Sequence, residues 1–189
     1  MMTMIYQILN LTNKEIELDS GEYIKIDREI KYEYDLYVGK NITKEIVQEI
    51  NYSYGIKIAY KFISKKDYTE KELYDKLENA EINIESLTKI IEKFINEKYI
   101  DDNIYTENYI KLKDMFSYNR IIYELTKKGI KKDIINEKYK EMNINEQNKI
   151  RKILVKLGKK TDEQKINYLM RQGFFYEDII YTIKNIDEI

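Results

Sequence analysis

The second half of the sequence and part of the first repeat one pattern three times, at intervals of 48 and then 44 residues. Each copy opens with a hydroxyl residue, a good helix N-cap, and reaches a leucine eight residues later. The openers are Thr69, Ser117 and Thr161, and the leucines are Leu77, Leu125 and Leu169. A period in this range is typical of stacked helical arrays, in which each unit packs mainly against its neighbours.

The flanking residues complete the helical interpretation. Glu72 and Gln164 stand three residues after their openers, which is the spacing of a capping box. Gly129 and Gly173 follow their leucines by four residues, where a helix often ends in a left-handed residue. Apolar residues at helical spacing precede and follow each copy. The sequence therefore predicts three tandem three-helix bundles, spanning residues 54–100, 101–142 and 143–189, that form an elongated, curved array.

The segment from Lys98 to Tyr105 joins the first repeat to the second without glycine or proline. Asp101 can accept hydrogen bonds from the first amides of the following helix, and Asp102 falls in the positive first turn. Tyr99 and Ile100 can bury against the helices on both sides. We expect a short, packed joint that holds its two sides at a set angle.

Residues 1–38 show the alternation of β-strands. A three-residue loop with Gly21 at positive φ would place Ile16 opposite Ile24 in a hairpin. We expect a third strand at Met4–Ile8 and a short fourth at Leu36–Val38. A helix is predicted from near Thr43, so residues 1–53 form a β-rich segment with a leading helix.

The composition excludes most of the side chains that enzymes use for catalysis. The chain has no Cys and no His, so it lacks thiolate nucleophiles, zinc–sulfur sites and the side chain best suited to proton transfer near neutral pH. No nucleophile–base pair, phosphate-binding loop or metal-ligand cluster stands out. We expect no catalytic residue, no metal and no cofactor, and therefore not an enzyme.

The N-terminus lacks the basic region and long apolar run of a signal peptide, and no apolar run approaches membrane-spanning length. These features predict a cytoplasmic protein without a membrane partner.

Several segments, in order over nearly the whole chain, resemble those of the RecX family of bacterial regulatory proteins. They are Asp19-Ser20-Gly21-Glu22-Tyr23, Ala59-Tyr60-Lys61-Phe62-Ile63-Ser64 leading into Thr69–Leu73, Lys98-Tyr99-Ile100-Asp101-Asp102, Arg120–Leu125 with Lys128-Gly129-Ile130, and Arg171-Gln172-Gly173-Phe174 with Tyr176. The most specific part of the resemblance is the joint, where a tyrosine, an isoleucine and two aspartates occur within a chain of three repeats.

The resemblance implies a non-enzymatic, monomeric modulator of the RecA recombinase. Proteins of this family are thought to lodge in the groove of the RecA–DNA filament and bridge neighbouring protomers. This limits filament growth and damps ATP hydrolysis, strand exchange and cleavage of the SOS repressor. RecA is therefore the expected partner, with weak direct contact to DNA as a further expectation.

Two segments depart from the family pattern. Many relatives carry an arginine-rich run where this chain has Ser117-Tyr118-Asn119-Arg120, which puts DNA contact by the second repeat in doubt. The short helix of the first repeat ends at Asn79-Ala80-Glu81-Ile82 without the glycine, which predicts a different helix end there.

Basic side chains gather in the third repeat, where residues 143–173 carry eight basic and three acidic groups. The first candidate set for contact with RecA or phosphate is Lys149, Arg151, Lys152, Lys156, Lys159, Lys160, Lys165 and Arg171. A smaller second set around Gly129 is Arg120, Lys127, Lys128, Lys131 and Lys132. Solvated helix faces are the alternative explanation for both sets.

Other features have a structural explanation. Adjacent residues on a helix do not face one another, so Asp101 and Asp102 suit capping better than a metal or acid–base pair. Gly129, Gly173, Phe174 and Tyr99 belong to the structural motif of the repeats. Most of the tyrosines at helical spacing belong to the core rather than to base-stacking platforms. The alternative function is a stand-alone helical-repeat protein that binds nucleic acid, and the salt dependence of DNA binding without RecA separates the two functions.

Overall fold

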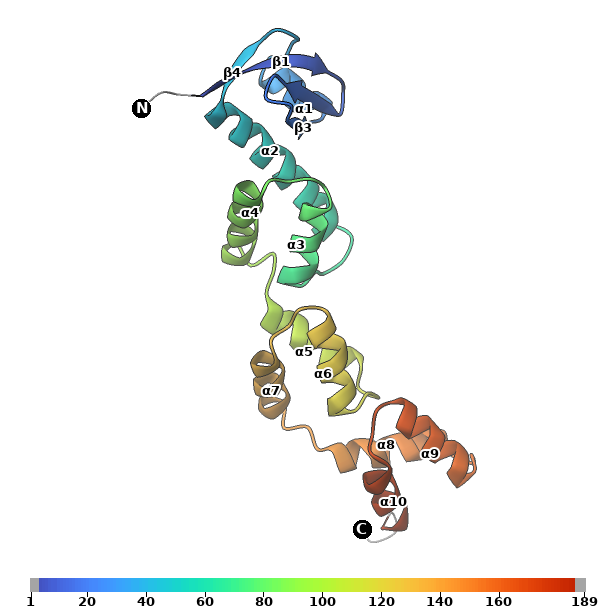
Figure 1. Cartoon of the computed structure of the whole chain (residues 1–189). Helices are drawn as coiled ribbons and strands as arrows, with labels where there is room; N and C mark the ends of the chain where they lie inside the picture. The colour runs from blue at the N-terminus through green and yellow to red at the C-terminus, as the bar shows by residue number, and fades with distance from the viewer. Residues whose placement is uncertain (1–3, 186–189) are drawn as a thin grey trace. The chain divides into compact units, whose positions relative to one another are not determined.

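The computed structural model describes residues 4–185, and the chain divides into two compact units at Ile100/Asp101. The chain is mainly helical and carries a small antiparallel sheet near its N-terminus, which confirms the predicted fold class (Figure 1). The division falls at the predicted border between the first and second repeats.

The sheet has the strand order β3-β2-β1-β4 and joins strands that are all antiparallel to their neighbours. Its strands are β1 (Ile5–Leu11), β2 (Glu15–Leu18), β3 (Tyr23–Lys25) and β4 (Asn41–Thr43). Ile16 pairs with Ile24, and Gly21 has φ +84°, so the predicted hairpin register is confirmed. A slip of one residue would have turned the buried Ile16 and Leu18 toward solvent.

Two N-terminal predictions are wrong. The segment Leu36–Val38 is not a strand, because it runs into a turn in which the Lys40 amide donates to Tyr37 O at 3.2 Å. Leu36 is buried, and both Tyr37 and Val38 are more than half exposed. The fourth strand is β4, which pairs with β1. The predicted β region also contains a helix, α1 (Arg28–Glu33), whose N-cap is Asp27.

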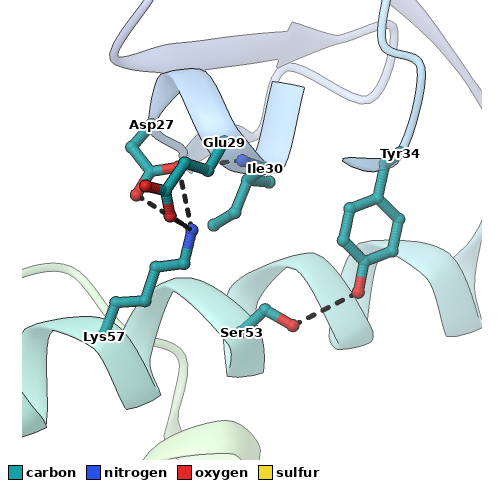
Figure 2. Close-up of polar contacts among 6 residues, drawn as sticks. All are labelled: Asp27, Glu29, Ile30, Tyr34, Ser53 and Lys57. Atoms are coloured by element: carbon teal, nitrogen blue, oxygen red, sulfur yellow. Dashed lines mark hydrogen bonds and ion pairs between the residues drawn. The ribbon is translucent and has the colours of Figure 1, made fainter. Parts of the chain in front are cut away.

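The helix α1 is fixed on α2 (Lys44–Ile63) at both of its ends, as Figure 2 shows. At one end, Lys57 Nζ lies 3.3 Å from both oxygens of Asp27 and 2.7 Å from Glu29 Oε2. Burial opposes the charge on Lys57, but these carboxylates outweigh it and raise the pKa of the ammonium group. At the other end, the hydroxyls of Tyr34 and Ser53 are 3.2 Å apart. The sheet and α1 therefore share one core with the first half of α2.

The helix α2 is continuous through residue 54, where the sequence predicted a border between the β-rich segment and the first repeat. Its first half covers the sheet, and its second half packs on the first repeat. Gly55 makes this possible, because a Cβ at that position would lie 2.5 Å from Ile90 Cδ1. The glycine serves a close approach between helices and does not break α2.

The remaining helices follow the predicted repeats (Figure 1). They are α3 (Glu70–Glu78), α4 (Ile84–Asn96), α5 (Asp102–Leu112), α6 (Tyr118–Lys127), α7 (Lys132–Glu141), α8 (Glu146–Leu157), α9 (Asp162–Arg171) and α10 (Tyr176–Lys184). Both predicted capping boxes form, and the Ser117 hydroxyl accepts from the Arg120 amide as an N-cap. Each repeat has its own buried cluster, built around Leu77, Leu125 and Leu169.

The short helices of the three repeats end with the same geometry. Gly129 and Gly173 have φ of +89° and +90°, and the next residue in each case donates to the carbonyl five positions back. Glu81 takes the same place in the first repeat, with φ +62° and the Ile82 amide 3.2 Å from Leu77 O. The prediction of a different helix end in the first repeat is therefore wrong. The fold imposes a left-handed residue there even without glycine.

This geometry predicts that Glu81→Gly stabilises the chain. A left-handed conformation costs a non-glycine residue about 1–2 kcal/mol, and the larger unfolded-state entropy of glycine offsets part of the gain. The variant also loses an exposed ion pair with Lys25 of little value. We expect the free energy of unfolding, measured by urea denaturation, to rise by about 0.5–1 kcal/mol. Lys76→Gly, within α3, should instead lose about 1 kcal/mol, and a similar loss in Glu81→Gly would contradict the prediction.

Each end of the joint is fixed within its own unit. Ile100 is buried in the core of the first repeat, and the Tyr99 ring, about half exposed, packs against Tyr60 and Phe94. Asp101 caps α5, as predicted, by accepting from the Asn103 and Ile104 amides. The set angle between the two sides stays a prediction.

Candidate partner-binding surface

Helix α8 carries four of the predicted contact residues, and its winding sends them in different directions. Its buried stripe includes Ile150, Ile153 and Leu154. Lys149 precedes Ile153 by one turn and lies on this inner side, whereas Lys152 and Lys156 lie one turn apart on the exposed side. The cluster of basic letters in the sequence is therefore not a single surface.

Lys149 holds the third repeat against the second. Its ammonium group donates to Phe116 O at 2.7 Å and to the Tyr139 hydroxyl at 3.1 Å, and its side chain is 11% exposed. Burial lowers the pKa of this lysine, and the nearby Glu146 opposes that shift. Because its donors are already used inside the unit, we leave Lys149 out of the proposed surface.

Glu146 is the acceptor at the centre of the same contact. One of its oxygens accepts from the Tyr118 amide at 3.0 Å, and the other accepts from the Tyr139 hydroxyl. Burial and this carboxylate both raise the pKa of Tyr139. Tyr118 and Tyr139 belong to the second repeat, so Glu146 and Lys149 form a polar bridge between the two repeats.

Arg120 and Arg171, one from each predicted set, also belong to this interface. The Arg120 guanidinium donates to the Arg171 carbonyl and stacks 4.1 Å from the Phe116 ring centre. The Ser117 amide donates to Gln172 O at 2.9 Å. The turn after α9 is thus fastened to the start of α6 through the carbonyls of Arg171 and Gln172. The guanidinium of Arg120 belongs to this interface, whereas the side chain of Arg171 is exposed and remains a candidate for contact.

The outward-facing lysines of the first set are Lys152, Lys156, Lys159 and Lys160, which we call the α8 basic face. Lys156 lies 3.6 Å from Asp114, and within residues 4–185 the other three side chains make no hydrogen bond or ion pair. The side chain of Val155, which is 76% exposed, lies among them. Lys165 is paired with Asp162 at 3.7 Å, and Arg151 is half-buried, so both lie apart from this face.

The second set divides in a similar way. Lys127 and Lys128 lie 5.9 Å and 5.6 Å from the ring centres of Tyr123 and Tyr105, at the limit of cation–π contact. Lys131 and Lys132 are exposed at the start of α7. These residues remain candidates for contact, but the structure does not join them into one patch with the α8 basic face.

The described part of the chain contains no group of three or more acidic residues arranged to hold a metal ion. No helix between residues 4 and 185 is both long and apolar enough to cross a membrane. What the fold and the surface define is a helical-repeat protein with an exposed basic face on its third repeat.

Comparison with known proteins identifies the family. No family model matches the chain. The regulatory protein RecX of Clostridium acetobutylicum is 31% identical over 189 residues, covering 90% of this chain and 88% of that protein. Its namesake from Clostridium beijerinckii is 32% identical over 186 residues, covering 88% and 86%. The chain belongs to the RecX family.

Solved structures share the fold. The crystal structure of RecX from Lactobacillus salivarius matches with a TM-score of 0.61 at 24% identity, over 74% of this chain and 98% of that one. A second crystal structure of a regulatory protein RecX matches with a TM-score of 0.60 at 16% identity, over 97% of this chain and all of that one. The second match extends the shared architecture to nearly the whole chain.

Proposed function

We propose that this protein is a non-enzymatic regulator that binds RecA on single-stranded DNA and limits filament growth. Through this, it damps ATP hydrolysis, strand exchange and cleavage of the SOS repressor. The observation that carries the proposal is the relationship, over about nine-tenths of the chain, to proteins named as regulatory protein RecX. The absence of Cys and His fits action by binding rather than by chemistry.

The repeat architecture supports this mode of action. Successive repeats on one chain can place several modest contacts on neighbouring protomers of a filament, and linked contacts bind far more tightly than each one alone. The α8 basic face supplies one such contact, since three of its lysines have no partner in residues 4–185. Positive charge at the edge of a protein–protein interface mainly raises the association rate and favours an acidic surface on the partner.

The test is the ATPase activity of RecA from the same organism on single-stranded DNA. We expect inhibition at well below one molecule of this protein per RecA, because a contact that blocks growth acts on a whole filament. No effect at equimolar protein would reject the function. At the protein-to-RecA ratio that inhibits ATP hydrolysis, this protein should also co-sediment with the RecA filaments.

A charge-reversal variant tests the surface separately. Changing Lys152, Lys156 and Lys159 to Glu should raise the amount needed for half-inhibition by about tenfold or more. The matched control changes Lys61, Lys65 and Lys76 to Glu, which are also exposed but lie in the first unit. Equal inhibition by both variants would remove the α8 basic face from the proposal and leave the function standing.

Binding to nucleic acid without RecA is the alternative, and the unpaired lysines of the α8 basic face are the observation in its favour. Affinity for single-stranded DNA that falls steeply with salt would signal many phosphate contacts. Tight, salt-sensitive binding together with no effect on RecA would select this alternative.

A further inference from the structure

A cavity of about 350 Å³ opens between the second and third repeats, within the second unit. Its walls come from the last turns of α5, the turn before α8, and α8 itself. This volume lies in the range of sites that hold a small ligand or part of a peptide. The polar bridge of Glu146 and Lys149 fixes the two repeats beside it.

The charge of the cavity is positive. In the described part of the chain, the cavity is lined by one carboxylate, that of Asp114, and by four lysines: Lys111, Lys149, Lys152 and Lys156. Lys111 is paired with Glu107, Lys149 is turned to Phe116 and Tyr139, and Lys156 lies 3.6 Å from Asp114. Lys152 has no such partner in the described chain. One wall therefore offers an uncommitted ammonium group, which favours an anionic occupant.

The rest of the lining selects among anions. It is aliphatic and thioether surface, from residues such as Ile144, Ile153 and Met115, together with the amides of Asn143, Asn145 and Asn148. Among residues 4–185, no aromatic or arginine side chain lines the cavity, so a nucleobase would find no surface there on which to stack. An apolar side chain can pack against this aliphatic and thioether surface, and the asparagine amides can form hydrogen bonds with a peptide backbone.

We propose that this cavity is the docking pocket for an acidic peptide segment of the protein partner. An aliphatic or methionine side chain of that segment packs on Ile144, Ile153 and Met115, and a neighbouring carboxylate pairs with Lys152. That the partner is a protein rests on the function proposed above. The α8 basic face continues from the rim of the pocket and attracts the same acidic segment.

Two variants test the pocket with the full chain. Asn148→Trp fills the cavity from an exposed helical position and leaves the charge unchanged. Lys152→Glu reverses the uncommitted charge. Lys65→Glu is the matched control, because it makes the same charge change at an exposed site in the first unit, outside both the lining and the α8 basic face. Thermal unfolding of each variant verifies that the fold is intact.

The probe is a fluorescent short peptide of glutamates around two leucines, followed by anisotropy. We expect saturable binding that Asn148→Trp and Lys152→Glu each weaken by about tenfold or more, while Lys65→Glu changes it by less than about threefold. The same peptide with glutamine in place of glutamate should bind at least about tenfold more weakly. Amide shift changes should centre on Ile144, Asn148 and Lys152.

Several outcomes would overturn the pocket. The first is that Asn148→Trp binds the peptide as tightly as the parent protein does. The second is that the glutamine peptide binds as tightly as the glutamate peptide. The third is that a thymidine oligonucleotide displaces the peptide and shifts the amide signals of the same residues. The RecA assay separates the two proposals. If Asn148→Trp still inhibits RecA, the pocket proposal is rejected and the proposed function stands. If the peptide binds to the pocket but the protein has no effect on RecA, the proposed function is rejected and the pocket stands.

Discussion

Gly173→Ala is expected to loosen the third repeat from the second at a cost of about 3 kcal/mol. A Cβ on Gly173 would lie 2.6 Å from Ser117 Oγ and 2.9 Å from Arg120 Cβ, closer than packed atoms tolerate. The glycine also has φ +90°, where alanine is strained by about 1–2 kcal/mol. Overpacking adds a further 1–3 kcal/mol or so. Because Ser117 and Arg120 begin α6, relief of the clash must pull the turn after α9 off its support.

The matched control for this prediction is Gly39→Ala. Gly39 has the same φ of +90°, but a Cβ there would have no atom of the described residues within 4 Å. It should lose only the conformational part, about 1–2 kcal/mol. Urea unfolding gives both values, and amide exchange in α9 and α10 should accelerate in Gly173→Ala alone. Equal losses in the two variants would mean that the close approach to Ser117 has no energetic weight.

The regular parts of this fold are predictable because local chemistry specifies them. Thr69, Ser117 and Thr161 cap helices through their own hydroxyls, and Gly129 and Gly173 end helices through their own φ angles. Such features need only a few neighbouring residues, so spacing in the sequence is enough to find them.

The errors arise where distant contacts decide. The helix α1 has six residues, too few for a periodic pattern, and it is held by Lys57 and Ser53 on another helix. Glu81 adopts a left-handed conformation that its own chemistry disfavours, because Ile82 must turn back into the core of the repeat. Neither constraint is written in the local sequence.

The candidate surface shows the same limit. The sequence groups Lys149 with Lys152 and Lys156 by charge, yet Lys149 donates to Phe116 O and to the Tyr139 hydroxyl of another repeat. One signal was present in the sequence, since Lys149 lies one turn before Ile153 on the apolar stripe. The cavity had no such signal, because its lining combines α5 and α8 from different repeats.

Glu146→Ala is expected to lower the free energy of unfolding by about 3 kcal/mol, an effect unusual for a partly exposed residue. The substitution leaves the Tyr118 amide and the Tyr139 hydroxyl without their acceptor, and each buried unsatisfied group costs about 1–3 kcal/mol. It also leaves Lys149, 11% exposed, without its nearest anion. Removal of one partner of a buried charge pair is the costly case.

Two further variants separate this bridge from a general effect of removing a carboxylate. Glu163→Ala removes an exposed carboxylate from the first turn of α9, and it should cost less than about 1 kcal/mol. Adding Lys149→Met to Glu146→Ala should cost less than the sum of the two single changes, because the second change removes the charge that the first one stranded. Strict additivity in urea unfolding would show that Glu146 and Lys149 act independently, and would contradict the polar bridge as a coupled pair.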